Sequence, residues 1–261
     1  MEENGIRINK YLSDQGICSR READRQVSGG NVLVNGHPAQ MGERVFLHDE
    51  IVFCGKKVEE QAEKKVILAF HKPQGIVCTT EKREKNNIVD YIHYPIRVYP
   101  VGRLDKDSEG LIFLTNDGDI VNRLMRAGNR HEKEYVVTTD KEVTASFLKG
   151  MSGGVPLTEL GVTTRPCTVK KLGKHQFSII LTQGYNRQIR RMCEYFGYRV
   201  RKLVRIRIMN VLLGDLKIGT YRTLTPEEEA TLRRKLLDSS NTTVVKEKGH
   251  GSDAKCRNIK S

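Results

Sequence analysis

One short segment concentrates the side chains that could take part in nucleophilic attack or proton transfer. Residues 102–111 read GRLDKDSEGL, with an arginine, a lysine and three acidic residues between two glycines. Arg103 and Asp105 are two positions apart, so both side chains point to one side if the backbone is extended. A positioned carboxylate can act as a nucleophile or a general base. The alternative is a solvated loop with a surface ion pair of little energetic value, and the segment alone favours that simpler interpretation.

The residues after this loop indicate how it is held. Leu111–Leu114 form an apolar run that predicts a buried strand, and Asn116–Gly118 predict the turn that ends it. The charged loop is therefore expected at the edge of a sheet, directly before a buried strand. Asp107 and Glu109 are expected to fix the loop rather than to react.

Composition points to a polyanionic partner. The chain has 261 residues, and its 45 basic against 32 acidic side chains give a formal net charge of +13. Such a charge favours encounter with nucleic acid and supplies phosphate contacts. No apolar run approaches the roughly 20 residues that cross a bilayer, and the N-terminus lacks the apolar core of a signal peptide. We expect a cytoplasmic protein that does not bind membranes.

The sequence predicts neither a metal nor a cofactor. None of the six cysteines forms a Cys-x-x-Cys pair, and the seven histidines are scattered. The phosphate-binding and dinucleotide-binding glycine motifs are absent, as is the Gly-x-Ser-x-Gly elbow of hydrolases. Any chemistry is therefore expected to come from side chains alone.

Residues 5–58 are predicted to form a small module of two helices followed by strands. Ser19 and Glu22 have the spacing of a capping box, in which each side chain accepts a backbone N–H at the helix start. Asn35-Gly36 predicts a tight hairpin turn. Residues 9–36 resemble the αL RNA-binding module of a small-subunit ribosomal protein and of several RNA-modifying enzymes. Helix N-termini attract phosphate, and the resemblance implies RNA contacts at Lys10, Arg20, Arg21 and Arg25; a solvated helix face is the alternative.

The rest of the chain predicts a second domain of the α+β class with a mainly antiparallel mixed sheet. The predicted order is a charged linker at residues 59–65, the domain at 66–238 and a disordered basic tail at 239–261. Strands are expected within 133–139 and 176–184, and helices within 117–128, 186–197 and 225–240. Residues 66–80 predict a strand, a Lys-Pro turn and another strand.

Four motifs in this domain resemble those of pseudouridine synthases of the RsuA branch, closest to the F-type large-subunit ribosomal RNA enzymes. They are FHKPQGIVCTT at 70–80, GRLDKDSEGLIFLTNDGD at 102–119, HEKEYVV at 131–137 and LTQGYNRQIRRMC at 181–193. With the N-terminal module, the resemblance covers about residues 5–235. Ser108 stands where related branches commonly carry threonine.

The resemblance implies a set of site residues. Asp105 is the catalytic carboxylate, and Tyr135 stacks on the uracil and assists proton removal at C5. Arg190 is expected to keep Asp105 ionised, because a nearby guanidinium opposes the effect of burial on a carboxyl pKa. The remaining substrate-binding residues are Arg103, Arg187, Gln188 and Ile189. A uridine inside folded RNA has to be flipped out of its stack to reach them.

The implied reaction is site-specific isomerisation of uridine to pseudouridine, in which the C1′–N1 bond breaks and a C1′–C5 bond forms. No redox or phosphoryl step occurs, so no cofactor is implied. The expected substrate is large-subunit ribosomal RNA, with a transfer RNA anticodon stem-loop as a second candidate, and a monomer is expected. Three alternatives remain: a non-catalytic RNA-binding ribosome-assembly protein on a synthase scaffold, a nuclease and a glycosidase.

Overall fold

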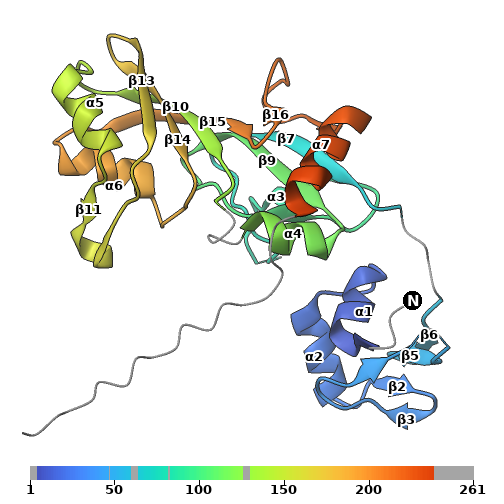
Figure 1. Ribbon diagram of the computed structural model, residues 1–261. Coiled ribbons are helices and arrows are strands. Elements are labelled where there is room, and N and C mark those ends of the chain that lie inside the picture. The colour runs from blue at the N-terminus through green and yellow to red at the C-terminus, as the bar shows by residue number, and fades with distance from the viewer. Residues whose placement is uncertain (1–4, 47, 60–63, 82, 126–129, 238–261) are drawn as a thin grey trace, which may run out of the picture.

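The computed structural model describes residues 5–46, 48–59, 64–81, 83–125 and 130–237, which form a small N-terminal module and a larger C-terminal domain (Figure 1). The protein is of the α+β class, as predicted. Part of the predicted linker and all of the predicted tail at 239–261 lie outside the described residues.

The N-terminal module packs two helices against short strands. The helices are α1 (Ile8–Asp14) and α2 (Arg20–Ser28). The strands are β1 (Ile6–Arg7), β2 (Val32–Val34), β3 (His37–Pro38), β4 (Arg44–Val45), β5 (Ile51–Phe53) and β6 (Lys56–Lys57). Strand β1 pairs with β4, and the other four form a sheet in the order β3-β2-β5-β6. The hairpin turn between β2 and β3 is confirmed, because Asn35 and Gly36 both have positive φ, at 48° and 83°.

The predicted capping box of α2 forms only in part. The backbone N–H of Glu22 donates to Ser19 Oγ at 3.1 Å, so the Ser19 cap is confirmed. The Glu22 carboxylate accepts instead from Arg25 and from Gln26 Nε2. A guanidinium one turn along the same helix offers a charge-assisted bond, which accounts for the choice.

A nine-stranded sheet forms the framework of the C-terminal domain. Its main path runs β13-β14-β10-β15-β9-β7-β17, with β8 also paired to β9 and β16 to β15. The bounds are β7 (Ile67–Lys72), β8 (Tyr99–Val101), β9 (Glu109–Thr115), β10 (Lys133–Thr139), β13 (Thr168–Gly173), β14 (Gln176–Leu181), β15 (Val200–Ile208), β16 (Val211–Leu212) and β17 (Tyr221–Thr223). The pairing of β15 with β9 is parallel, and the other pairings of this sheet are antiparallel.

Helices cover both faces of this sheet. They are α3 (Ile88–Ile92), α4 (Gly118–Met125), α5 (Ala145–Ser152), α6 (Gln188–Tyr195) and α7 (Pro226–Leu237). Residues 156–163 add the short pair β11 (Pro156–Leu157) and β12 (Val162–Thr163) around a 3₁₀ turn, Thr158–Leu160. Among the described residues, no helix is long and apolar enough to cross a membrane.

Strand β9 is buried along its whole length because it is covered on both faces. Leu111 and Phe113 pack with α4 and α7, whereas Ile112 and Leu114 pack with α3. A strand covered on both faces reads as a continuous apolar run. The expected position at the edge of the sheet is wrong, since β9 lies between β15 and β7. The charged loop therefore precedes a central strand, where packing on every side limits its movement.

The second strand expected within residues 66–80 is also wrong. After β7 the chain turns, and Val77 forms only an isolated bridge with Asn87. Ile76 and Cys78 are buried against the core that includes α3, so the alternation of apolar residues reflects burial without a partner strand. The turn has another contact, because the N–H of Gly75 donates to the carbonyl of Lys106 at 2.8 Å. The Lys-Pro turn is thus joined to the charged loop.

Candidate active site

A buried lysine, Lys72, fixes the loop that carries Asp105 through hydrogen bonds to backbone carbonyls. Lys72 is 0% exposed, and its ammonium donates to the carbonyls of Pro73 at 2.9 Å, Asp105 at 3.2 Å and Ser108 at 2.8 Å. Burial lowers the pKa of this ammonium. Three carbonyl oxygens converging on one donor group fix the backbone of the loop, and this leaves the Asp105 carboxylate to face the pocket.

A second cation holds the same loop from α6. The Arg190 guanidinium donates to the carbonyl of Asp107 at 3.1 Å and to that of Val200 at 3.3 Å. In this structure Arg190 is thus bound to backbone oxygens rather than to the Asp105 carboxylate. No ion pair joins that carboxylate to any cationic side chain of the described ranges. The sequence motif located Arg190 near the loop but did not reveal which atoms it binds.

Close approach of two strands brings a third cation to the site. Gly110 has φ +117°, and a Cβ there would lie 2.4 Å from the carbonyl oxygen of Arg205. Glycine at this position therefore permits the parallel pairing of β9 with β15. As a result, Arg205 Nε donates to the carbonyl of Leu111 at 2.6 Å, which fixes the guanidinium beside the first residues of β9.

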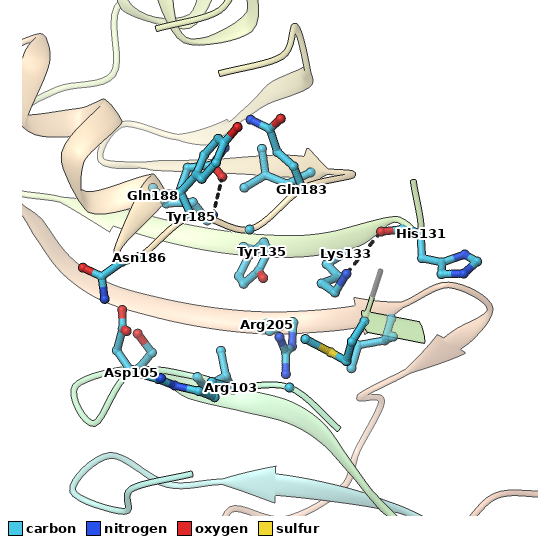
Figure 2. A pocket seen from close by; sticks show the side chains of 18 of the residues that line it. Arg103, Asp105, His131, Lys133, Tyr135, Gln183, Tyr185, Asn186, Gln188 and Arg205 are labelled. Atoms are coloured by element: carbon cyan, nitrogen blue, oxygen red, sulfur yellow. Dashed lines mark hydrogen bonds between the residues drawn. The ribbon is translucent and has the colours of Figure 1, made fainter. Parts of the chain in front are cut away.

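These elements enclose a pocket of about 420 Å³, within the range of small-molecule sites. Figure 2 shows Arg103 and Asp105 on the loop side, Lys133 and Tyr135 extending from β10, and Arg205 between them on β15. The segment Gln183–Ile189 lines the opposite side. Asp105 is the only carboxylate among the lining residues. The pocket thus holds one carboxylate, that of Asp105, and the ring of Tyr135, with the basic side chain of Arg205 between them at the bottom of the pocket, which we call its floor.

Tyr135 and Arg205 are direct neighbours across the sheet. They are partners in the register of β10 and β15, next to a bulge, and the guanidinium carbon lies 6.0 Å from the centre of the Tyr135 ring. Such an approach is at the outer limit of a cation–π contact. The ring is thereby held at the pocket wall, in a position to stack on a planar base.

Two further basic groups line the pocket from the start of β10. Burial and, to a smaller extent, the charge of Arg205 lower the pKa of Lys133 to about 8. Its ammonium donates to the carbonyl of His131 at 3.3 Å. Burial also lowers the pKa of His131, which favours the neutral imidazole.

The other predicted pocket residues fall into two groups. Ile189 is buried and lines the pocket, as does Gln188, whose side-chain oxygen accepts the N–H of Tyr185 at 3.0 Å. Gln188 thus shapes the segment before α6. Arg187 is exposed and lies 3.3 Å from the Asp107 carboxylate at the pocket rim.

Glu109 lies outside the pocket. Its carboxylate is buried 3.5 Å from His71 and 3.3 Å from Lys202, among the residues behind the loop. The expectation that Asp107 and Glu109 serve the structure of the loop agrees with these contacts.

The predicted RNA contacts of the N-terminal module are not part of the pocket. Arg20, Arg21 and Arg25 are exposed on α2, and Arg25 forms an ion pair with Glu22. Lys10 lies on α1, 2.9 Å from Asp14 and 3.7 Å from Asp119 of α4. The four cations lie on the two helices α1 and α2.

Three cations, two of them buried, were not identified as site residues from the sequence. Lys133 had an available signal, since it precedes Tyr135 by two positions on a strand and therefore shares its face. Lys72 lies in the Lys-Pro motif, which shows its type but not its partners. Arg205 gave no local signal, because its role depends on the pairing of β15 with β9.

Fold and pocket together define an RNA-directed enzyme: a basic helical module joined to a domain with one carboxylate in a cationic pocket. The sequence matches the RNA pseudouridylate synthase family over residues 66–195 and the S4 domain over residues 6–51. It is 53% identical over 245 residues to the dual-specificity RNA pseudouridine synthase RluF of Escherichia coli (strain K12), covering 94% of this chain and 83% of the relative.

Two other comparisons agree. The ribosomal large subunit pseudouridine synthase B of Bacillus subtilis (strain 168) is 36% identical, over 87% of this chain and 95% of the relative. A crystal structure of a pseudouridylate synthase superposes with a TM-score of 0.64 at 26% identity, covering 89% of this chain and all of the other. The chain belongs to the RNA pseudouridine synthases, with an N-terminal S4 domain. The comparisons give no support to a non-catalytic scaffold protein.

Proposed function

We propose that this enzyme isomerises specific uridines in large-subunit ribosomal RNA and takes a transfer RNA anticodon stem-loop as a second substrate. The relatives support this choice, one by its dual specificity and another by its large-subunit substrate. The net charge of +13 suits polyanionic substrates of both kinds. The enzyme would act as a cytoplasmic monomer.

The observation that carries the proposed chemistry is the isolation of Asp105. It is the one carboxylate that lines the pocket, and its loop is bonded to Lys72 and Arg190 through backbone oxygens. Asp105 would attack the sugar or the base, or would remove a proton to begin an elimination; each route uses its negative charge.

Tyr135 would hold the uracil after C1′–N1 cleavage. The ring stands at the pocket wall, and aromatic rings stack readily on bases that have left a helix. Its hydroxyl would assist removal of the C5 proton once the C1′–C5 bond has formed. Ile189 would pack beside the base, since its side chain is buried in the same wall.

The rim and the S4 domain would bind the RNA chain. Arg103 and Arg187 are exposed at the mouth of the pocket, where the backbone of a flipped nucleotide passes. On the S4 domain, Lys10, Arg20, Arg21 and Arg25 would contact phosphates. Arg190 would act indirectly, by fixing the Asp107 carbonyl and so the position of Asp105.

Pseudouridine mapping in cells provides the test. Ribosomal and transfer RNA from cells with and without the gene would be compared, and the deletion complemented with wild type or with Asp105→Asn. We expect at least one large-subunit site and one anticodon stem-loop site to disappear and to return only with the wild type. Loss of ribosomal sites alone would restrict the proposal to one substrate, and an unchanged map would refute it.

A further inference from the structure

The floor of the pocket holds a guanidinium group with unused hydrogen-bonding capacity. Arg205 is 3% exposed, and its Nε is bonded to the carbonyl of Leu111. One of its terminal nitrogens, Nη2, is fully buried and has no partner among the described residues. A buried, unpaired donor on a charged group is costly. Since Arg205 lines the pocket, the missing partner is expected to be a part of the substrate that takes the place of the atoms now covering Nη2.

The side chains that line the pocket also carry more positive than negative charge. Its lining includes four lysine and arginine side chains, those of Arg103, Lys133, Arg187 and Arg205, but a single carboxylate, that of Asp105. Lys133 is half-buried near Arg205, and the repulsion between them contributes to the lowered pKa of the lysine. Two cations close together in a poorly solvated site destabilise the enzyme without substrate. Such an arrangement suits a site in which negative charge appears during the reaction.

The position of Arg205 in the sheet indicates which part of the nucleotide can reach it. Arg205 lies on a central strand of the sheet, between the strands β10 and β9. A phosphate continues into the RNA chain on both sides and therefore has to remain near the rim, where Arg103 and Arg187 are exposed. The base is the end of its nucleotide and can enter the pocket fully. The floor thus faces the edge of the uracil rather than the backbone.

We propose that Arg205 donates its free N–H to a carbonyl oxygen of the flipped uracil and, together with Lys133, stabilises the negative charge that the base acquires when the C1′–N1 bond breaks. This inference rests on the proposed function and deepens it. It makes Arg205 a catalytic residue and gives the chemical reason for the cationic floor.

The bonding changes are as follows. The electron pair of the C1′–N1 bond moves to N1 and is shared with O2 and O4 of the base. In the substitution route, C1′ forms a bond to an oxygen of Asp105; in the elimination route, Asp105 takes the C2′ proton. The uracil then turns and C5 forms its bond to C1′. In the substitution route this displaces the Asp105 oxygen, and the electron pair of the C1′–O bond returns to the carboxylate; in the elimination route the proton held by Asp105 returns to C2′ as C5 bonds to C1′. Removal of the C5 proton and addition of a proton at N1 then complete the isomerisation. Arg205 bonds most strongly when O2 or O4 carries negative charge, so it lowers the barrier to cleavage.

Substitution of Arg205 tests the proposal. Arg205→Gln removes the charge and keeps a polar group near Leu111, whereas Arg205→Lys keeps the charge and loses the forked donor. Arg201→Gln is the matched control, because it removes the same charge from an exposed position of the same strand. Folding of each protein would be checked by thermal unfolding, and turnover measured under single-turnover conditions with saturating enzyme.

Loss of one donor that stabilises developing charge typically slows catalysis by about 10²–10³-fold. We expect Arg205→Gln to lose about that much in rate, with RNA affinity within about threefold of wild type. Arg205→Lys should retain part of the rate, and Arg201→Gln nearly all of it. A folded Arg205→Gln protein with a rate within about fivefold of wild type would overturn the proposal, as would a loss confined to RNA affinity, which indicates a phosphate contact.

Modified substrates identify the atom and do not require every variant to fold. RNAs with 2-thiouridine or 4-thiouridine at the target replace one carbonyl oxygen by sulfur, a poorer acceptor. We expect one of these RNAs to slow the wild type and to slow Arg205→Gln much less, which is the non-additivity of two groups in contact. Equal slowing of both proteins by both RNAs would reject the contact. Turnover of unmodified RNA by the wild type reports on the proposed function, so the two failures are distinguishable.

Discussion

The S4 domain and the catalytic pocket use positive charge in opposite ways. On α2, Arg20, Arg21 and Arg25 are exposed to solvent. In the catalytic domain, Lys72 and Arg205 are almost completely buried, and each donates to named backbone oxygens. Exposed cations attract phosphate with little dependence on geometry and lose strength as salt is added. Buried cations are costly unless they are bonded, so they remain only where their positions are fixed.

This difference assigns separate tasks to the two regions. In the proposed function, the exposed surface would raise the affinity for RNA, whereas the buried cations hold the Asp105 loop and lie beside the pocket. Changes in the pocket are therefore expected to alter the rate of the chemical step with little effect on binding. Changes on the S4 surface are expected to alter binding in proportion to the phosphate contacts removed.

The largest effect is expected from Asp105→Asn, which removes the single carboxylate of the pocket lining. The side chain keeps its size, but each proposed route needs its charge. Loss of such a group costs roughly 10⁴-fold or more in rate. RNA affinity should be maintained, because no phosphate contact is removed. Pseudouridine would be measured by mass spectrometry after nuclease digestion, with deamidation of the protein excluded by its intact mass.

Asp107→Asn is the matched control for this change. It removes a carboxylate from the same loop, but one that is exposed and forms an ion pair with Arg187 at the rim. We expect its rate to remain within about tenfold of wild type, as for a surface ion pair. Comparable loss of activity in both variants would show that the loop needs its overall charge and not a reagent at Asp105.

A smaller effect on rate, together with a loss of stability, is expected from Lys72→Met. The substitution leaves three carbonyls of the loop region, at least partly buried, without their donor, which should lower the free energy of unfolding by about 3 kcal/mol. A shift of the loop by about 1 Å should also slow turnover about 10²-fold. Lys106→Met, at an exposed position of the same loop, should change neither quantity. Unfolding in urea and single-turnover rates would be measured, and normal turnover in a destabilised Lys72→Met protein would separate Lys72 from the geometry of Asp105.

Removal of exposed charge from the S4 domain should have a moderate effect on binding alone. We expect the double variant Arg20→Gln and Arg21→Gln to bind RNA about tenfold more weakly near 0.15 M salt and to reduce the slope of log affinity against log salt by about two. The rate at saturation should not change. The control, Arg234→Gln with Lys235→Gln, removes the same charge from exposed positions of α7. Equal weakening by both pairs would indicate non-specific attraction.

Local sequence patterns were sufficient for most of the elements. The strands β10 and β14 and the helices α6 and α7 were predicted from the spacing of apolar residues. Helix α7 follows Thr225, whose hydroxyl accepts the N–H of Glu228 at 3.1 Å. The motif order indicated the family and the pocket wall. These features depend on neighbours within a few residues, which a sequence displays directly.

The features that were missed depend on long-range pairing. Arg205 binds a carbonyl 94 residues away in the sequence, and Lys72 binds one 36 residues away. The central position of β9 follows from its parallel pairing with β15. The same reason explains the strand wrongly expected after the Lys-Pro turn, where burial of alternate residues was mistaken for pairing. A buried cation has no local signature, because its partner is an oxygen atom of the backbone.

The smallest expected effect is a change of rate with pH that depends on Lys133, one of the cations that line the pocket. Its pKa of about 8 means that it is charged below that pH and neutral above it. If its charge assists departure of the base, the single-turnover rate should fall a few-fold as pH rises from about 7 to about 9. Lys133→Arg should keep its charge over this range, so its rate should show no such fall.

The contribution of Lys133 to stability should increase with pH while the rate falls. The fall in rate can therefore be distinguished from unfolding of the protein at alkaline pH. The pKa of Lys133 is lower in the folded protein than its ordinary value of 10.5, so between about pH 8 and 10.5 the folded state binds fewer protons than the unfolded state. The contribution of Lys133 to the free energy of unfolding therefore increases with pH across this window. Urea unfolding of wild type and Lys133→Arg at several pH values would measure the difference between them. A rate that falls while this difference grows would assign the titration to Lys133; a parallel fall in rate for both proteins would assign it to another group and remove Lys133 from the reaction.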